Sequence, residues 1–149
     1  MASDAEWVRD QLRSVLATSE TKVRMVSTGA RVLPALRRRS ADLVILDLQI
    51  GNMGGMAVCL DLRLEESAGR LGHQKVIMLL DRRADVFLAR RSGADGWLVR
   101  PLDPIRLRRA SQAVLAGGTY YDESYKPNPI LVAPVLVSPA SGSISAAGK

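Results

Sequence analysis

The sequence predicts an α/β domain in which helices cover a parallel sheet. Stretches whose apolar residues recur at helical spacing alternate with two strand-like segments, 42–47 and 75–80, in which residues 43–46 and 76–80 are all apolar. This alternation is typical of βαβ units. The 149 residues, of which 47% are hydrophobic, are enough for one core and a tail but few for two separate cores. We therefore expect one domain.

Two helices and two strands are expected before residue 48. In order, they are a helix over 5–17, a strand over 22–27, a helix over 30–39 and a strand over 42–47. The apolar residues at helical spacing in the first helix are Trp7, Val8, Leu12, Val15 and Leu16. Asp4 is placed to cap this helix, and Pro34 falls in the first turn of the next one, where proline is tolerated. The run 42–47 has the composition of a strand buried on both faces, and it ends at Asp47.

The same alternation continues to residue 116. The expected elements are a helix over 56–66, a strand over 75–80, a helix over 84–92, a strand over 97–99 and a helix over 104–116. Glycines at 51, 54 and 55 make the loop before the first of these helices flexible. Gly93 and the pair Gly117 and Gly118 supply helix stops.

The composition changes after residue 121. Prolines punctuate the segment 122–149, which then ends in serine, glycine and alanine. Such composition favours an extended or disordered chain. We expect a domain over 1–121 and a C-terminal extension over 122–149, in which the apolar run 130–137 could contribute a strand.

Charge and cysteine content limit the classes of function. The net charge of +6 could suit nucleic acid, but the arginines are paired or lie at helical spacing, and aromatic residues make up only 4%. Nucleic-acid binding is therefore disfavoured. One cysteine, Cys59, and one histidine, His73, exclude an internal disulfide and a zinc site built from these residues. Without a signal-peptide pattern or a run long enough to span a bilayer, a cytoplasmic protein is expected.

Three ordered motifs carry a resemblance to a known family. They are 42–55 (DLVILDLQIGNMGG), 76–80 (VIMLL) and 93–101 (GADGWLVRP). Together they resemble the receiver domain of bacterial two-component response regulators. The resemblance implies a flavodoxin-like three-layer sandwich with a five-stranded parallel sheet of order 2-1-3-4-5, and a reactive site at the carboxyl ends of the strands.

The resemblance also implies a phosphate-accepting site. Asp47 takes the position of the carboxylate that forms an acyl phosphate. In the family, two acids after the first strand hold Mg²⁺ together with that carboxylate and a backbone carbonyl two residues beyond it. The acid positions fall on Ser3 and Asp4, so one acid is lost, and the carbonyl is that of Gln49. The implied metal ligands are thus Asp4, Asp47 and the Gln49 carbonyl.

Three further positions depart from the family pattern or vary it. Arg100 stands in place of the phosphate-contacting lysine, Leu80 in place of the switch serine or threonine, and Trp97 in place of the switch tyrosine or phenylalanine. Leu80 cannot donate a hydrogen bond to a phosphoryl oxygen. Asp81 and Asp85 could replace the lost acid, but a helix cap or first-turn charge is the preferred interpretation.

A receiver should begin with a buried strand before Ser3, yet only Met1 and Ala2 precede it here. An unfilled central slot would leave buried backbone groups unpaired. One hypothesis is a circularly permuted receiver in which residues 130–137 fill the slot. Pro134 argues against it, since proline removes a ladder hydrogen bond. The alternative is that the given start omits the natural strand, leaving a partner chain or disorder to compensate.

The expected function is a single-domain response-regulator-like signalling protein of a phosphorelay, phosphorylated at Asp47 by a histidine kinase or phosphotransfer protein. It would act on a downstream protein through the face formed by residues 84–116, with no enzymatic activity beyond gain and loss of its own phosphoryl group. A homodimer is left open. The alternative is a phosphorylation-independent pseudo-receiver, a scaffold or a nucleic-acid-associated regulatory subunit.

Overall fold

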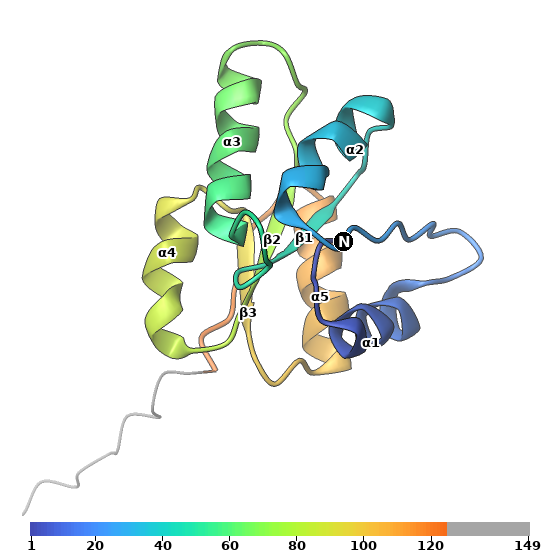
Figure 1. Ribbon diagram of the computed structural model, residues 1–149. Coiled ribbons are helices and arrows are strands. Elements are labelled where there is room, and N and C mark those ends of the chain that lie inside the picture. The colour runs from blue at the N-terminus through green and yellow to red at the C-terminus, as the bar shows by residue number, and fades with distance from the viewer. Residues whose placement is uncertain (125–149) are drawn as a thin grey trace, which may run out of the picture.

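The computed structural model describes residues 1–124, which form a parallel sheet covered by helices on both faces (Figure 1). The strands are β1 (Val44–Asp47), β2 (Val76–Leu80), β3 (Gly96–Val99) and β4 (Tyr120–Tyr121). The helices are α1 (Glu6–Leu16), α2 (Val32–Arg38), α3 (Gly55–Ser67), α4 (Val86–Arg91) and α5 (Pro104–Leu115), with 3-10 turns η1 (Gly29–Arg31) and η2 (Arg83–Asp85). None of the helices in these residues has the length and apolar character that a membrane span requires.

Two apolar cores lie on the two faces of the sheet. Helices α2, α3 and α4 pack on one face, and α1 and α5 pack on the other. In β1, alternate side chains serve the two cores, with Leu46 on the first face and Ile45 on the second. Every residue of β1, β2 and β3 is buried, which explains why their sequences read as continuous apolar runs.

The predicted helices and central strands are confirmed with small shifts at their ends. The expected helices over 30–39 and 84–92 each begin with a 3-10 turn, η1 and η2. Gly93 and Gly117 adopt positive φ after α4 and α5, as the helix-stop interpretation requires. The capping role expected of Asp4 is wrong: the N-cap of α1 is Ala5, which makes no side-chain cap hydrogen bond.

The sheet has the expected parallel pairing, but not five full strands. Its hydrogen-bonded order is β1-β2-β3-β4, and β4 is an edge strand that the sequence analysis did not predict. The expected strand over 22–27 is reduced to a bridge at Val26. Ala2 lies between Val26 and Leu46 and bridges both in parallel. The strand order of the family, 2-1-3-4-5, is thus followed. Its strands 2 and 1 are represented by single bridges at Val26 and Ala2, and β4 is an extra strand at the far edge.

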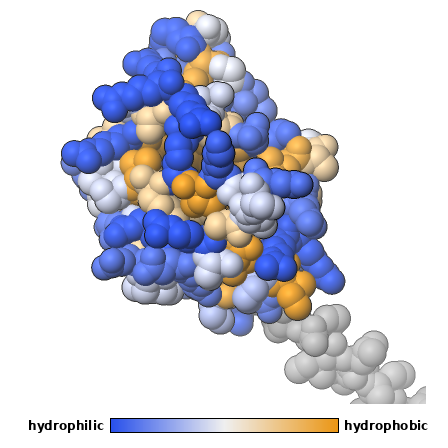
Figure 2. Space-filling model, turned by 90° about the vertical axis from the view of Figure 1, so that its right-hand side faces the viewer, coloured by the Kyte–Doolittle hydropathy of each residue, from blue (hydrophilic) through white to orange (hydrophobic). Residues whose placement is uncertain are grey.

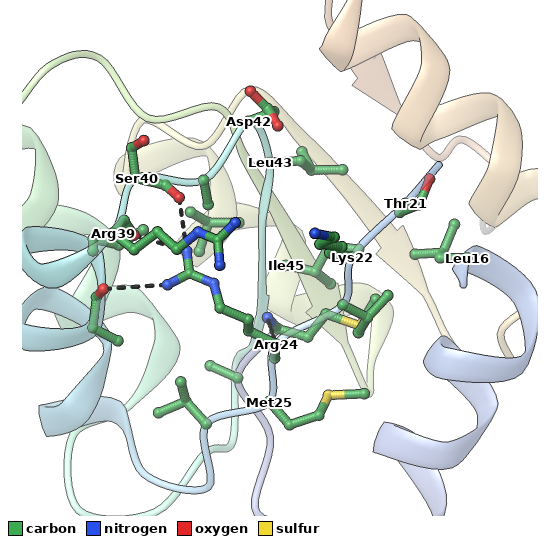
Figure 3. Close-up of a pocket in the computed structure, with 18 of the residues that line it drawn as sticks. Leu16, Thr21, Lys22, Arg24, Met25, Arg39, Ser40, Asp42, Leu43 and Ile45 are labelled. Atoms are coloured by element: carbon green, nitrogen blue, oxygen red, sulfur yellow. Dashed lines mark hydrogen bonds between the residues drawn. The ribbon is translucent and has the colours of Figure 1, made fainter. Parts of the chain in front are cut away.

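Residues 1–124 therefore fill the central slot only at its carboxyl end. Ala2 donates to the Ile45 carbonyl at 2.8 Å and accepts from the Asp47 amide at 2.9 Å, while Ser3 donates to the Val26 carbonyl at 3.1 Å. Below Met1, a cavity of about 720 Å³ continues between residues 20–26 and 39–45 (Figure 3). The hypothesis that residues 130–137 fill the slot concerns residues outside the described part of the chain.

Candidate functional site

Asp47 is buried at the carboxyl end of β1, and both of its carboxylate oxygens are hydrogen-bonded. Oδ2 accepts from the Ser3 hydroxyl at 2.8 Å and from the Arg100 guanidinium at 2.7 Å. Oδ1 accepts from the Gln49 amide at 3.2 Å. Only 3% of the Asp47 side chain is exposed. Such a carboxylate is held in one orientation by groups from three separate segments of the chain.

Arg100, the residue directly after β3, contacts Asp47. Its guanidinium lies between the carboxylates of Asp47 and Asp81, and its side chain is 16% exposed. The ring of Trp7, on α1, covers the guanidinium with 5.2 Å between the ring centroid and Cζ, a cation–π geometry. The positive group therefore sits over Asp47 and is itself covered by an aromatic ring.

Asp4 lies beside the same loop that Asp47 contacts. Its Oδ2 accepts from the Gly51 amide at 3.0 Å, which explains why it does not cap α1. The backbone amide of Gln49, two residues before Gly51, donates a hydrogen bond to Asp47. Both carboxylates thus accept hydrogen bonds from backbone amides of the short loop 49–51.

The oxygen groups at this loop are of the chemical types that bind Mg²⁺ in proteins. Mg²⁺ keeps several waters and is commonly bound through one or two carboxylates. Asp4 and Asp47 supply two carboxylates, and Gln49 supplies the carbonyl that the sequence analysis assigned. Ser3 donates its hydroxyl to Asp47, so it adds no charge in the place of the second acid. Within residues 1–124, no group of three or more acidic, histidine or cysteine side chains has the arrangement of a metal site.

Leu80 and Trp97 lie in the core on the α4 side of the sheet. Leu80, the last residue of β2, is completely buried. Trp97 is 3% exposed, and its ring stacks on Tyr121 of β4 with centroids 4.2 Å apart. The guanidinium of Arg90 lies 5.5 Å from the Trp97 ring centroid. The aromatic side chain is thus held inward by packing, and Leu80, in the same core, has no hydrogen-bonding group on its side chain.

The sequence analysis assigned Asp47, Arg100, Asp4 and Gln49 to one site. The structure places Arg100 and the Gln49 amide against Asp47, and Asp4 against Gly51 of the same loop. Trp7 was grouped with the apolar face of its helix, but it is 61% exposed and covers Arg100. The spacing of apolar residues in this helix already separates Trp7 from the buried face. Val8, Leu12 and Val15 form the buried face of α1, and Trp7 is one residue, about 100° of helix, away from Val8. Asp81, interpreted as a helix-turn charge, instead contacts Arg100.

Comparisons with known proteins identify the family. Residues 1–112 match the model of the response regulator receiver domain. Among curated proteins, the chain is similar to the transcriptional regulatory protein GltR of Pseudomonas aeruginosa, with 32% identity covering 77% of this chain and 47% of the relative. It is also similar to the sensory transduction protein RegX3 of Mycolicibacterium smegmatis, with 29% identity covering 83% of this chain and 53% of the relative. The chain spans about half the length of these relatives.

Solved structures show the same fold. The receiver domain of NtrX from Brucella abortus superposes with a TM-score of 0.67 at 20% identity, over 77% of this chain and 95% of that one. A putative response regulator from Chloroflexus aurantiacus gives a TM-score of 0.70 at 22% identity, over 77% and 93% of the two chains. At this identity the likeness concerns the fold alone.

Proposed function

The chain belongs to the response regulator receiver family, and on that premise we propose that it is the receiver module of a phosphorelay that accepts a phosphoryl group on Asp47. Family membership supports a role in phosphorelay signalling. Phosphoryl transfer to Asp47, the identity of the donor and the downstream partner are proposals. The donor is a histidine kinase or phosphotransfer protein, the compartment is the cytoplasm, and no catalytic activity is proposed beyond gain and loss of that phosphoryl group.

One observation carries the proposal: the Arg100 guanidinium lies 2.7 Å from the carboxylate of Asp47 at the carboxyl edge of the sheet. In the transfer, an Asp47 oxygen forms a bond to phosphorus as the phosphorus–nitrogen bond of a phosphohistidine breaks, and the imidazole leaves with the electron pair. Arg100 would move from the carboxylate to the phosphoryl oxygens, whose charge it offsets. Mg²⁺, held by Asp4, Asp47 and the Gln49 carbonyl, would supply further charge neutralisation when bound.

The test is phosphoryl uptake by the full chain. The protein is incubated with Mg²⁺ and a small phosphodonor such as acetyl phosphate, and intact-mass spectrometry measures the gain of one phosphoryl group. We expect a gain in the natural protein and none in Asp47→Asn. Asp42→Asn, which removes a carboxylate at the opposite end of β1, is the matched control and should retain the gain. Equal labelling of Asp47→Asn and the natural protein would reject the proposal.

A second candidate is a pseudo-receiver that binds its partner whatever the state of Asp47. Two observations favour it: Leu80 is completely buried where the switch hydroxyl would stand, and Ser3 replaces one acid. A phosphoryl group needs a hydrogen-bond donor that follows it if its charge is to change a distant surface. No mass gain, together with partner binding unaffected by Asp47→Ala, would favour this candidate over the first.

The output surface proposed for either candidate is the face made by α4, β3 and α5. Phe87 and Ile105 on this face are 61% and 64% exposed, and Arg91 lies over the Phe87 ring, 5.5 Å from its centroid. Exposed apolar side chains beside arginines suit a protein partner whose contact surface is acidic with apolar anchors. A scaffold and a nucleic-acid-associated subunit are two forms of the second candidate. Each would use this same surface, made by α4, β3 and α5.

A further inference from the structure

The Arg100 guanidinium uses only part of its hydrogen-bonding capacity within residues 1–124. Its Nη1 donates to the Asp81 carboxylate, and its Nη2 donates to the Asp47 carboxylate at 2.7 Å. The third nitrogen, Nε, is buried and has no hydrogen-bond partner among these residues. A buried donor without a partner is rare, because the cost of its desolvation is not offset. This N–H is therefore a candidate contact for a bound anionic group.

The free donor belongs to the same edge of the guanidinium as the one that contacts Asp47. In every arginine, the Nε–H and one N–H of Nη2 point in the same direction and form a fork that matches two oxygens of a carboxylate or phosphoryl group. In Arg100, this edge has one nitrogen on Asp47 and one that is free. A phosphoryl group on Asp47 carries enough oxygens to accept from both.

Asp81 holds the other end of the guanidinium. It directly follows β2, as Arg100 directly follows β3, and the Arg100 amide donates to the Leu80 carbonyl at 2.9 Å. The two residues are therefore neighbours across the β2–β3 ladder. Of the Asp81 side chain 37% is exposed, against 3% of the Asp47 side chain. Because Nη1 stays on Asp81, Arg100 keeps one anchor when Nη2 moves from Asp47 to a phosphoryl oxygen.

Trp7 covers one face of the same guanidinium, with 5.2 Å between its ring centroid and Cζ. Its helix, α1, lies on the side of the molecule seen in Figure 2, where hydrophilic side chains surround separate apolar patches. The first turn of α1 is tied to the site, since the Arg9 guanidinium donates to the carbonyls of Ser3 and Asp4, both at 2.8 Å. The ring keeps water from this face of Arg100, which strengthens the interaction of the cation with an anion.

We propose that Asp81 and Trp7 are positioning residues for phosphoryl transfer to Asp47. Asp81 holds Nη1 of Arg100, Trp7 covers the guanidinium, and the Nε–Nη2 edge is thereby left to bind two oxygens of the phosphoryl group. The inference rests on the proposed phosphorylation of Asp47 and adds roles for two residues that do not touch the phosphoryl group. It also gives a reason for arginine at position 100, because an ammonium bound to Asp81 offers no second pair of donors in a fixed fork.

The test follows the Nε–H of Arg100 by NMR in the full-length protein. Beryllofluoride, an anion that binds an aspartate carboxylate with the geometry of a phosphoryl group, is the probe, added with Mg²⁺. Fluorine NMR measures how much of the probe is bound, and ¹H–¹⁵N spectra follow the Nε–H resonance, which is assigned by its absence in Arg100→Lys. We expect this resonance to move downfield in the natural protein on binding, and its exchange with water to slow by about tenfold or more.

Two substitutions of Asp81 test its role. Asp81→Leu removes the acceptor of Nη1, so the probe should still bind while the shift and the slower exchange of the Nε–H are lost. Asp81→Asn keeps a side-chain oxygen that accepts from Nη1, and it should restore both changes. A general loss of stability would not produce this difference between the two variants in a single side-chain resonance.

Trp7 is tested by the same resonance without the probe. Trp7→Leu should speed exchange of the Arg100 Nε–H by about threefold or more, because water reaches the uncovered guanidinium, whereas Trp7→Phe keeps an aromatic ring and should not. Phe87→Leu is the matched control. It removes a ring that is also 61% exposed and also lies beside an arginine, Arg91, at 5.5 Å, and it should leave the Arg100 resonance unchanged.

Each other outcome overturns the inference. Bound probe with an unchanged Nε–H resonance in the natural protein would reject the fork while leaving the phosphorylation of Asp47 in place. Natural behaviour of Asp81→Leu or Trp7→Leu would reject the role of that residue. Loss of probe binding in Asp81→Leu would show that Asp81 acts on Mg²⁺ or on the phosphoryl group directly. Failure of the natural protein to bind the probe would reject the proposed function together with this inference.

Discussion

The Arg100 guanidinium lies 2.7 Å from the Asp47 carboxylate, with 16% of the arginine side chain and 3% of the aspartate side chain exposed. The two residues are 53 positions apart in the chain, and they meet because β1 and β3 end at the same edge of the sheet. This pair joins the end of β1 to the turn after β3. It is the contact on which both the proposed chemistry and part of the stability depend.

Removing the charge of Arg100 should destabilise the protein strongly. Arg100→Met leaves the buried Asp47 carboxylate without its cation, and we expect the free energy of unfolding to fall by about 3 kcal/mol. Urea denaturation followed by circular dichroism measures this. In the double variant Asp47→Asn/Arg100→Met the loss should be much smaller, because no charge is left unpaired. Arg82→Met, at a side chain 74% exposed, is the control and should change stability by less than about 0.5 kcal/mol.

Glu65 should make stability depend on acid pH. The hydrogen bond from Arg70, followed by that from Arg37, lowers the pKa of Glu65 from 4.5 to about 2. A folded-state pKa below the unfolded value means that the stabilisation is present above about pH 4.5 and is lost as the pH falls toward 2. Thermal unfolding between pH 2 and 6 should show a shallower decline for Glu65→Gln than for the natural protein. Parallel curves for the two proteins would contradict this assignment.

The sequence predicted the central strands because burial on both faces imposes a continuous apolar run, which is a local signal. The resemblance to receiver domains implied that Asp47 and Arg100 share one site, at the edge where the carboxyl ends of parallel strands lie. Ala2 could not be recognised in the same way. Its pairing with Val26 and Leu46 uses one residue, and a single residue carries no periodicity. The two-residue strand β4 escaped detection for the same reason.

Asp122 should anchor β4 and the chain that leaves it. Its carboxylate is buried and accepts hydrogen bonds from the Val99 amide at 3.0 Å and from Arg106 at 2.6 Å. Burial by itself would raise the pKa of Asp122, but the hydrogen bonds from Ser124 and Val99 and the charge of Arg106 outweigh burial and lower the pKa. We expect Asp122→Ala to cost about 2–4 kcal/mol of unfolding free energy, since a buried amide and a guanidinium lose their acceptor. Chemical denaturation checks this, with Glu20→Ala, at an exposed glutamate, as the control.

The Met1 amino group should give stability a second pH dependence, near neutrality. Burial, followed by the charge of Arg24, lowers the pKa of this group from 8.0 to about 6. Between these values the unfolded chain binds more protons than the folded chain, so the free energy of unfolding should rise from pH 6 to pH 8, by on the order of 2 kcal/mol.

Acetylation of the amino terminus and the substitution His73→Gln separate the contribution of the amino group from that of the one histidine in the sequence. Acetylation of the amino terminus removes the charge but keeps an N–H that can donate to the Arg24 carbonyl, so the acetylated protein should show a flat stability between pH 6 and 8. His73→Gln keeps the free amino group and should retain the rise. A different result would contradict this assignment. If the rise in stability disappears in His73→Gln and persists after acetylation, the amino group of Met1 is not desolvated in the folded protein, and its burial between Val26 and Ile45 is wrong.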